Sequence, residues 1–502
     1  MTVYEGRHVQ KGEPIGMLLV SGATHGLFFG LPAGIEPDLA GQTPGLGRPH
    51  LPVERRLAPI AGASPVPLRA ARVSWLFFTL FLHCKEGGGA EWVKSAMLMT
   101  GIRREGGKGL GYLRRWRYVP DGPRDLRIDF MRGMALMLMI VTHVEIISVF
   151  NLFTSERFGF TTGAEIFVIL SGFVLGQTKR RQLQHSDMAT VSYSLLRRAA
   201  TLYAVNIVII VSVLALSQLP WLNSFEVTHF TQRHDELIYS LYPIAAQSRE
   251  AWFNQILFLQ IGPQQTQILG LYFYLLLGTP LVVWMLQRGY GGALFIISLE
   301  LYIAYQLYPV DIIDAQFEYA FPPLAWQFIY TLGVMCGWYK GELQSLAKTL
   351  PGKRVIGLMI AVFLVLFFVI QNNTNPFIPA RFFLHVLPDY RFDYINNVLA
   401  GKNELGLLRV VNDACLLLAL YLLLSYLWLP ISRAVGWFFI LMGQNSLYVF
   451  ILHLYVVMAI SQWVRFGLWQ HAWLENTLTH GLALAVLWLM ARFGILRRIV
   501  PN

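Results

Sequence analysis

The chain has 502 residues, of which 55% are hydrophobic and only 14% are charged, and its mean hydropathy is +0.49. Soluble domains carry about a quarter charged residues, so this composition excludes ordinary soluble domains and favours a polytopic all-α membrane protein. The net charge of +11 does not indicate a nucleic-acid partner, because the basic residues cluster at the ends of apolar runs. Three cysteines without paired or metal-ligand spacing (Cys84, Cys336 and Cys415) predict neither a disulfide nor a metal site.

Residues 1–122 differ from the rest of the chain, being rich in Gly, Pro and Arg with weak periodicity. Their best apolar run, Val73 to Cys84, is too short to span a bilayer. Three interpretations fit this extension: a disordered cytoplasmic segment, a poorly formed domain, or sequence translated upstream of the true start. We favour the third, with a start at Met97 or Met99, because the segment resembles no folding unit. Residues 123–502 then form a single membrane domain.

Ten apolar runs follow Leu126, and we predict a transmembrane helix for each. The runs cover about Phe130 to Phe150, Thr162 to Thr178, Ala199 to Leu219, Gln267 to Leu286, Gly291 to Leu307, Leu324 to Trp338, Val355 to Ile370, Leu407 to Leu429, Val435 to Ile460 and Leu478 to Ile495. The mixed segment from Pro220 to Thr266 fits interfacial or re-entrant helices.

Basic residues predict the orientation of these spans. They gather before the first span, between the second and third, between the sixth and seventh, and after the tenth. With an even number of spans, all four groups lie on one side, so both termini are predicted to be cytoplasmic. The loop after the seventh span is an exception, because Arg381, Arg391 and Lys402 would lie outside.

The first two spans carry ionisable residues that a membrane helix normally avoids, and such residues are functional candidates. Arg132 and His143 are eleven residues apart, which places them on one helix face about 16 Å apart along the axis. His143 is the leading candidate for a general base, against a simple packing role. Arg132 suits an anionic ligand, or is only a flanking charge that Asp129 neutralises. Glu165 either orients His143 or is an acid at a helix start.

Other polar residues are also candidates for a functional role, and each has a purely structural alternative. Arg197 and Arg198 lie at the start of the third span. They either bind the phosphates of the donor or serve only to set the orientation of the span. The ninth span carries Asn445, Ser446 and His453, which suit acceptor binding or an oxyanion hole, or helix-to-helix hydrogen bonds. A charged cluster lies near the eighth span and consists of Lys402, Glu404, Arg409 and Asp413. These residues could bind a polar acceptor, whereas Lys402 and Glu404 could instead be solvated charges of a loop. Gly172 suggests close helix packing in the second span.

From about Asp125 to the C-terminus the sequence resembles the OpgC-type branch of the acyltransferase-3 superfamily. The motifs that carry the resemblance are RIDFMRGMALMLMIVTHV, TTGAEIFVILSGFVLG, LGLYFYLLLGTPLVV, AWQFIYTLGV, GKNELGLLRVVND and MGQNSLYVFILHLYV. The extension of residues 1–122 lies outside it. The superfamily's arginine, ten residues, histidine pattern falls on Arg132 and His143, and its cytoplasmic arginine region falls on Arg197 and Arg198.

The resemblance implies O-acyl transfer across the bacterial inner membrane. The expected donor is a cytoplasmic acyl-CoA, such as succinyl-CoA, and the expected acceptor is a hydroxyl of a periplasmic glucan. No tightly bound cofactor is expected; membrane lipid and the glycan acceptor are the expected partners. We expect His143 and Glu165 in catalysis, Arg132, Arg197 and Arg198 at the donor, and Asn445, Ser446 and His453 at the acceptor or oxyanion.

Two interpretations from other classes stay open. A transporter or flippase for a glucan or another glycan precursor also fits long outer loops and intramembrane charge, but the sequence shows no internal repeat of the kind that transporters often carry. A membrane scaffold, in which the polar residues only pack helices, predicts variants that fail through lost expression.

Overall fold

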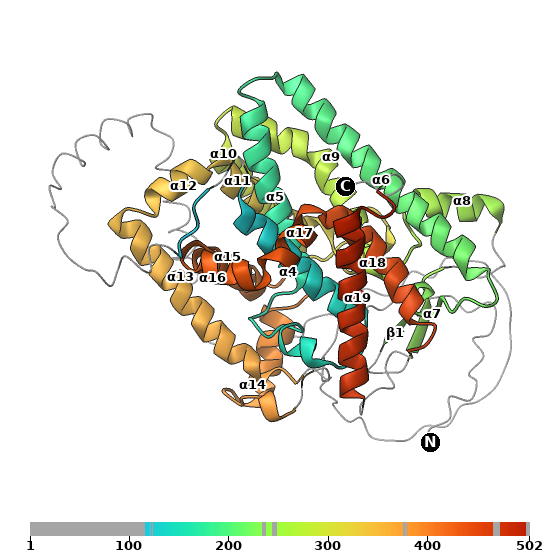
Figure 1. Ribbon diagram of the computed structural model, residues 1–502. Helices are drawn as coiled ribbons and strands as arrows, with labels where there is room; N and C mark the ends of the chain where they lie inside the picture. Colours follow the sequence, from blue (N-terminus) through green and yellow to red (C-terminus); the bar gives the residue numbers. More distant parts are fainter. Residues whose placement is uncertain are drawn as a thin grey trace, which may run out of the picture. The chain divides into compact units, whose positions relative to one another are not determined.

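The computed structural model describes residues 116–497, except 121, 123, 233–236, 243–247, 375–377, 379 and 465–471. The prediction for the N-terminal extension therefore lies almost entirely outside the described residues. The described part is mostly helical (Figure 1). Its long helices are α4 (Leu126–His143), α5 (Gly163–Gln182), α6 (Met188–Ser217), α9 (Ile268–Gln287), α10 (Gly291–Leu307), α11 (Pro323–Trp338), α13 (Leu350–Val369), α15 (Leu407–Tyr426), α17 (Trp437–Gln444), α18 (Ser446–Ile460) and α19 (Trp473–Phe493).

Short elements connect these helices. They are α7 (Phe225–Thr228), β1 (His229–Gln232), β2 (Leu237–Ser240), α8 (Arg249–Leu257), α12 (Lys340–Leu346), α14 (Asp389–Tyr394) and α16 (Trp428–Ile431). β1 and β2 pair antiparallel, with His229 opposite Ser240. This hairpin departs from the all-α prediction and lies in the mixed segment that fits interfacial or re-entrant helices.

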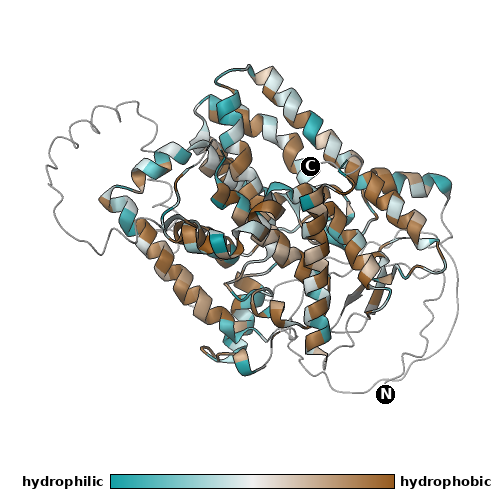
Figure 2. Ribbon diagram, viewed as in Figure 1, coloured by the Kyte–Doolittle hydropathy of each residue, from teal (hydrophilic) through white to brown (hydrophobic). Residues whose placement is uncertain are grey.

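Four described helical segments are long and apolar enough to cross a membrane: Met188–Ser217, Gln264–Gln287, Leu350–Asn372 and Leu407–Tyr426. A fifth is added if α17 and α18, which meet at a bend of 92°, are counted as one span. The other predicted spans also form helices, but α10 is shorter and α4 and α5 carry several charges. These apolar helices fit a membrane protein, while the number of ten spans stays a prediction. Figure 2 shows hydrophobic residues along most of α13.

Helices distant in sequence pack side by side. The pairs with the most extensive contacts are α5 with α11, α4 with α17 and α6 with α9. Glycines permit the closest approach. A Cβ on Gly443 of α17 would lie 1.8 Å from the backbone oxygen of Asp129 in α4, and one on Gly133 of α4 would lie 2.0 Å from that of Phe439 in α17. Small residues therefore bring α4 and the broken α17–α18 span together.

The predicted first span is wrong at its end, because α4 stops at His143 and not at Phe150. Val144 leaves the helical region, and Ser148 then caps a short 3₁₀ helix, Val149–Leu152, in a capping box with Asn151. The predicted ninth span is broken in the middle. Asn445 has φ −111° and ψ 36°, and it separates α17 from α18. Both corrections place functional candidates at helix ends.

Candidate active site

Two histidines from different helices meet at the end of α4. His143 is the last residue of α4, and its Nδ1 lies 2.8 Å from Nε2 of His453 in α18. The rings stack with centroids 5.0 Å apart and planes 23° apart. His453 is 1% exposed, and its Nδ1 is hydrogen-bonded to the backbone oxygen of Phe450 one turn earlier in α18. The ninth-span histidine is thus a direct neighbour of the predicted base.

A third histidine fixes the end of α4. The Nε2 of His480, in α19, lies 2.9 Å from the backbone oxygen of Val144 and 3.2 Å from that of Val141. Its Nδ1 lies 2.8 Å from Oγ of Ser148. These bonds satisfy carbonyl groups that a helix end leaves without partners. They hold the backbone on both sides of His143 in place.

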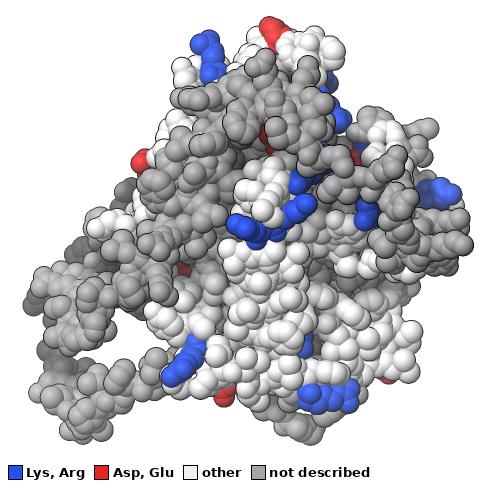
Figure 3. All heavy atoms as spheres, turned by 90° about the vertical axis from the view of Figure 1, so that its left-hand side faces the viewer, with Lys and Arg blue, Asp and Glu red and all other residues white. Residues whose placement is uncertain are grey.

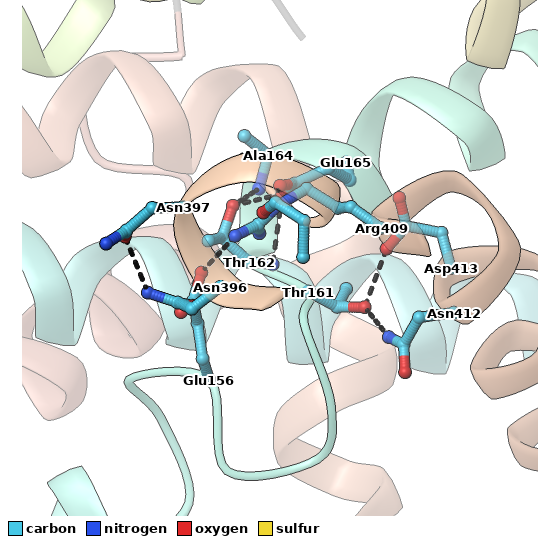
Figure 4. A network of polar contacts seen from close by, with 11 residues as sticks. Glu156, Thr161, Thr162, Ala164, Glu165, Asn396, Asn397, Arg409, Asn412 and Asp413 are labelled. Atoms are coloured by element: carbon cyan, nitrogen blue, oxygen red, sulfur yellow. Dashed lines mark hydrogen bonds and ion pairs between the residues drawn. The ribbon is translucent and has the colours of Figure 1, made fainter. Parts of the chain in front are cut away.

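Glu165 belongs to a buried ion network and not to the histidine pair (Figure 4). It is the third residue of α5, where its Oε2 accepts from the backbone NH and the hydroxyl of Thr162. Its Oε1 accepts from Arg409 of α15 at 3.0 Å, and Arg409 also donates to Glu156 at 2.8 Å and to the backbone oxygen of Ala400 at 2.9 Å. The prediction that Glu165 orients His143 does not fit these partners, because His453 contacts that ring.

Neighbouring polar residues hydrogen-bond the loop between α4 and α5 to α15 (Figure 4). Thr161 donates to Asp413 at 2.6 Å and accepts from Asn412 at 2.5 Å. Gly159 is required beside them, because its φ is +124° and a Cβ there would lie 2.3 Å from Oδ1 of Asn412. Arg409 and Asp413, which we considered for acceptor binding, are buried in this structural network.

A cavity of about 180 Å³ lies among α4, α5, α6, α9, α11 and α18. Its walls are mostly apolar, but three cationic side chains reach it, from Arg132, Lys179 and Arg198. Arg132 is hydrogen-bonded to the hydroxyl of Ser446 in α18, while its buried Nε has no partner in the described part of the chain. The cavity therefore concentrates positive charge in an apolar surrounding.

The predicted donor and acceptor residues separate in the structure. Arg132 and Arg198 line the cavity and Arg197 does not, although Arg197 and Arg198 are both exposed residues. Ser446 also lines the cavity, and the Oδ1 of Asn445 accepts from Arg497 at 2.7 Å. Both residues lie seven or eight positions before His453, about 10 Å along α18. The structure thus brings His453, and neither Asn445 nor Ser446, to His143.

Phe450 contacts both the cavity and the histidine pair. Its side chain lines the cavity, its ring centroid lies 4.9 Å from that of His453, and its backbone oxygen is bonded to His453. Its ring also stacks on Phe167, with centroids 6.4 Å apart. One aromatic residue is therefore the shared wall between the cationic cavity and the candidate base.

The structure does not support the alternative in which Asp129 pairs with Arg132. Arg124 donates to both carboxylate oxygens of Asp129, at 2.6 and 2.8 Å, which leaves Arg132 for the cavity. The neighbouring Asp125 caps α4 and bonds to Arg127 and Lys340. Burial acts to raise the pKa of Asp125, but its bonds to Arg127 and Lys340 outweigh burial and lower that pKa.

Sequence inspection did not single out Lys179, Tyr272 or His480 as site residues. In the sequence Lys179 is only an orientation signal, and the phenol of Tyr272 is buried in the cavity wall beside Ser171. His480 carried a usable signal, since an ionisable residue inside an apolar run is unusual. Within the described residues, no group of three or more His, Cys, Asp or Glu is placed to hold a metal ion.

A family model described as OpgC protein matches residues 124–498. The match begins at the turn before α4 and ends after α19, so it includes every residue of the site described above. It covers well over half of the chain. A search of curated proteins finds no match to the sequence.

Proposed function

The chain belongs to the OpgC protein family, and on this basis we propose that it is a membrane O-acyltransferase. The proposed reaction moves an acyl group, succinyl in the first instance, from a cytoplasmic acyl-CoA to a hydroxyl of a periplasmic glucan. One observation carries the proposal. The His143–His453 pair is separated from a cavity with three cationic side chains by the side chain of Phe450.

The cavity suits the phosphate-bearing part of the donor. Arg132, Lys179 and Arg198 supply positive charge, and guanidinium groups match phosphate geometry. Ser446 and Leu447 place the first turn of α18 in the wall, where backbone NH groups and the helix dipole favour an anion. The present volume is below the roughly 300–1,000 Å³ of ligand pockets. In the proposed mechanism a residue of the wall therefore moves to admit the donor arm. Phe450 is the candidate, because it separates the cavity from the histidine pair.

His143 acts as the general base in the proposed step. The acceptor hydroxyl gives its proton to His143 as its oxygen attacks the thioester carbonyl carbon. The tetrahedral intermediate then collapses, the carbon–sulfur bond breaks, and the imidazolium returns the proton to the thiolate. The products are the glucan ester and free CoA-SH. No covalent enzyme intermediate is needed.

The proposal is tested on the glucans themselves. Mass spectrometry compares periplasmic glucans from a strain lacking this protein with those from strains complemented by wild type, His143→Ala or His229→Gln. We expect wild type and His229→Gln, whose histidine lies in the β-hairpin, to restore a succinyl-sized mass increment, and His143→Ala to fail at equal expression. Normal succinate on glucans from the His143→Ala strain would sink the assignment of the base.

A transporter or flippase is the second candidate, and the broken α17–α18 span favours it. Discontinuous helices bent at a polar break are typical of substrate sites in transporters, and this pair bends by 92° at Asn445. The same glucan experiment separates the candidates. Unmodified glucans retained in the cytoplasm of the deletion strain would support transport, and exported but unacylated glucans support acyl transfer.

A further inference from the structure

We infer that His453 is a positioning residue that keeps the proton of His143 on Nδ1 and leaves the lone pair of Nε2 for the acceptor hydroxyl. The inference rests on the proposed function only where it calls His143 a base. The bonding order itself follows from the geometry of three groups: the Phe450 carbonyl, the His453 ring and the His143 ring.

The first link fixes the tautomer of His453. Its Nδ1 is bonded to the backbone oxygen of Phe450, and a carbonyl oxygen can only accept. Nδ1 of His453 must therefore carry the hydrogen. A neutral imidazole has one N–H, so Nε2 of His453 is an acceptor. Because the carbonyl belongs to the same helix, three residues earlier, the folding of α18 itself sets this tautomer.

The second link is the hydrogen bond between the two rings, through which the tautomer of His453 determines that of His143. Its Nδ1 lies 2.8 Å from Nε2 of His453, and two ring nitrogens approach this closely only when one donates. Since Nε2 of His453 accepts, Nδ1 of His143 donates. No described group is bonded to Nε2 of His143, which therefore keeps its lone pair. This nitrogen is the atom that would take the acceptor proton.

The same bond assists the charged state that forms during the reaction. When Nε2 of His143 gains a proton, its Nδ1–H becomes a charge-assisted donor to His453, and such bonds are about twice as strong as neutral ones. Serine hydrolases use a buried carboxylate for this purpose. Here the carboxylate of Glu165, the sequence-based candidate for this role, is bonded to Arg409. A neutral ring costs less to bury within an apolar helix than an unpaired carboxylate.

Nitrogen NMR tests the tautomer without any reference to activity. Protein labelled with ¹⁵N-histidine is compared with a His143→Gln sample, and the difference gives the signals of His143. We expect a protonated Nδ1 and an unprotonated Nε2 in wild type, and a change toward a protonated Nε2 in His453→Phe. A protonated Nε2 in wild type would overturn the inference even if acyl transfer is confirmed.

Three substitutions at His453 separate positioning from packing. His453→Gln keeps an oxygen near the place of Nε2, whereas His453→Asn keeps only a donor for the Phe450 carbonyl and His453→Phe keeps only the ring volume. A general base contributes roughly 10²–10⁴-fold. We expect His453→Phe and His453→Asn to lose about a hundredfold or more in kcat, and His453→Gln to be clearly more active than both.

The ordering of the three variants decides the result. Equal losses in all three, at equal expression, would mean that His453 only fills space, and full activity in His453→Phe would mean that His143 needs no partner. If wild type itself transfers no acyl group, the proposed function fails. The NMR comparison still decides the tautomer in that case, so the two failures are distinguishable.

Discussion

At the scale of single residues, Arg409 is a fully buried cation with several partners. It is 1% exposed and donates to Glu156, Glu165 and a backbone carbonyl. These partners come from the loop after α4, the start of α5 and the segment before α15. Arg409 thus joins the start of α15 to the loop between α4 and α5, which is more than 240 positions away in the sequence. We expect the conformation of that loop to depend on these bonds.

Replacing Arg409 by Met is expected to cost about 3–5 kcal/mol of stability, because Glu165 would remain buried and unpaired. The double variant Glu165→Gln/Arg409→Met is expected to lose less than the sum of the two single variants, since the partners are coupled. Thermal unfolding of the detergent-solubilised protein measures both effects. A loss below about 1 kcal/mol for Arg409→Met would contradict the role of the network.

The matched control is a partly exposed arginine pair of similar geometry. Arg180 lies 2.6 Å from Glu342, with side chains 40% and 39% exposed. Exposed pairs contribute about 0–1 kcal/mol, so Arg180→Met is expected to have a small effect. A comparable loss at both sites would mean that burial does not distinguish them.

At the scale of elements, α5 and α11 pack through glycines spaced four residues apart on both helices. The glycines are Gly172 and Gly176 on α5, and Gly333 and Gly337 on α11. A Cβ on Gly176 would lie 2.0 Å from the backbone oxygen of Val334, and one on Gly337 would lie 1.9 Å from that of Phe173. This is the small-residue packing typical of membrane helices. It sets the position of α5, and with it the cavity wall.

Gly337→Ala is expected to destabilise the protein by about 1–3 kcal/mol, because the contacting atoms are backbone and the helices must separate. The control is Gly357→Ala on α13, where a Cβ would meet nothing within 4 Å. That change is expected to be neutral or to stabilise by up to about 1 kcal/mol through helix propensity. Thermal unfolding of both variants checks the contrast, and equal effects would contradict it.

At the scale of the whole membrane domain, the contacts pair segments predicted to lie on the same side. Lys340 is bonded to Asp125 at 3.2 Å, and Arg180 to Glu342 at 2.6 Å; these segments are all predicted to be cytoplasmic. The Arg409 network instead joins segments near the predicted outer surface. On the face drawn in Figure 3, Lys and Arg lie above and below a broad band of uncharged residues. The contacts fit the predicted grouping of loops on two sides, while the side that is cytoplasmic stays a prediction.

Cysteine labelling tests that orientation. After replacement of Cys84, Cys336 and Cys415 by Ser, one cysteine is placed at an exposed position, either Q184C between α5 and α6 or D389C in α14. A maleimide that cannot cross the inner membrane is expected to label D389C in intact cells and Q184C only after lysis. The reverse pattern would overturn the orientation.

The sequence was informative where a signal is local, and uninformative where it depends on tertiary contacts. Apolar runs predicted helices near α9, α10, α11 and α15 with boundaries close to those observed. The apolar residues after His143 extended the first prediction too far, because the helix end depends on Ser148 and on His480 of α19. The pairing of His143 with His453 joins residues 310 positions apart, so spacing alone could not reveal it.

The position of Phe450 also bears on how tightly the membrane is sealed. The ring of Phe450 lies between the cationic cavity, which is near the predicted cytoplasmic side, and the histidine pair, which is nearer the predicted periplasmic side. Under the proposed function, removing the ring would open a path between these two sites. Under the proposed function, Phe450 would therefore also limit proton leakage and the hydrolysis of acyl-CoA by periplasmic water.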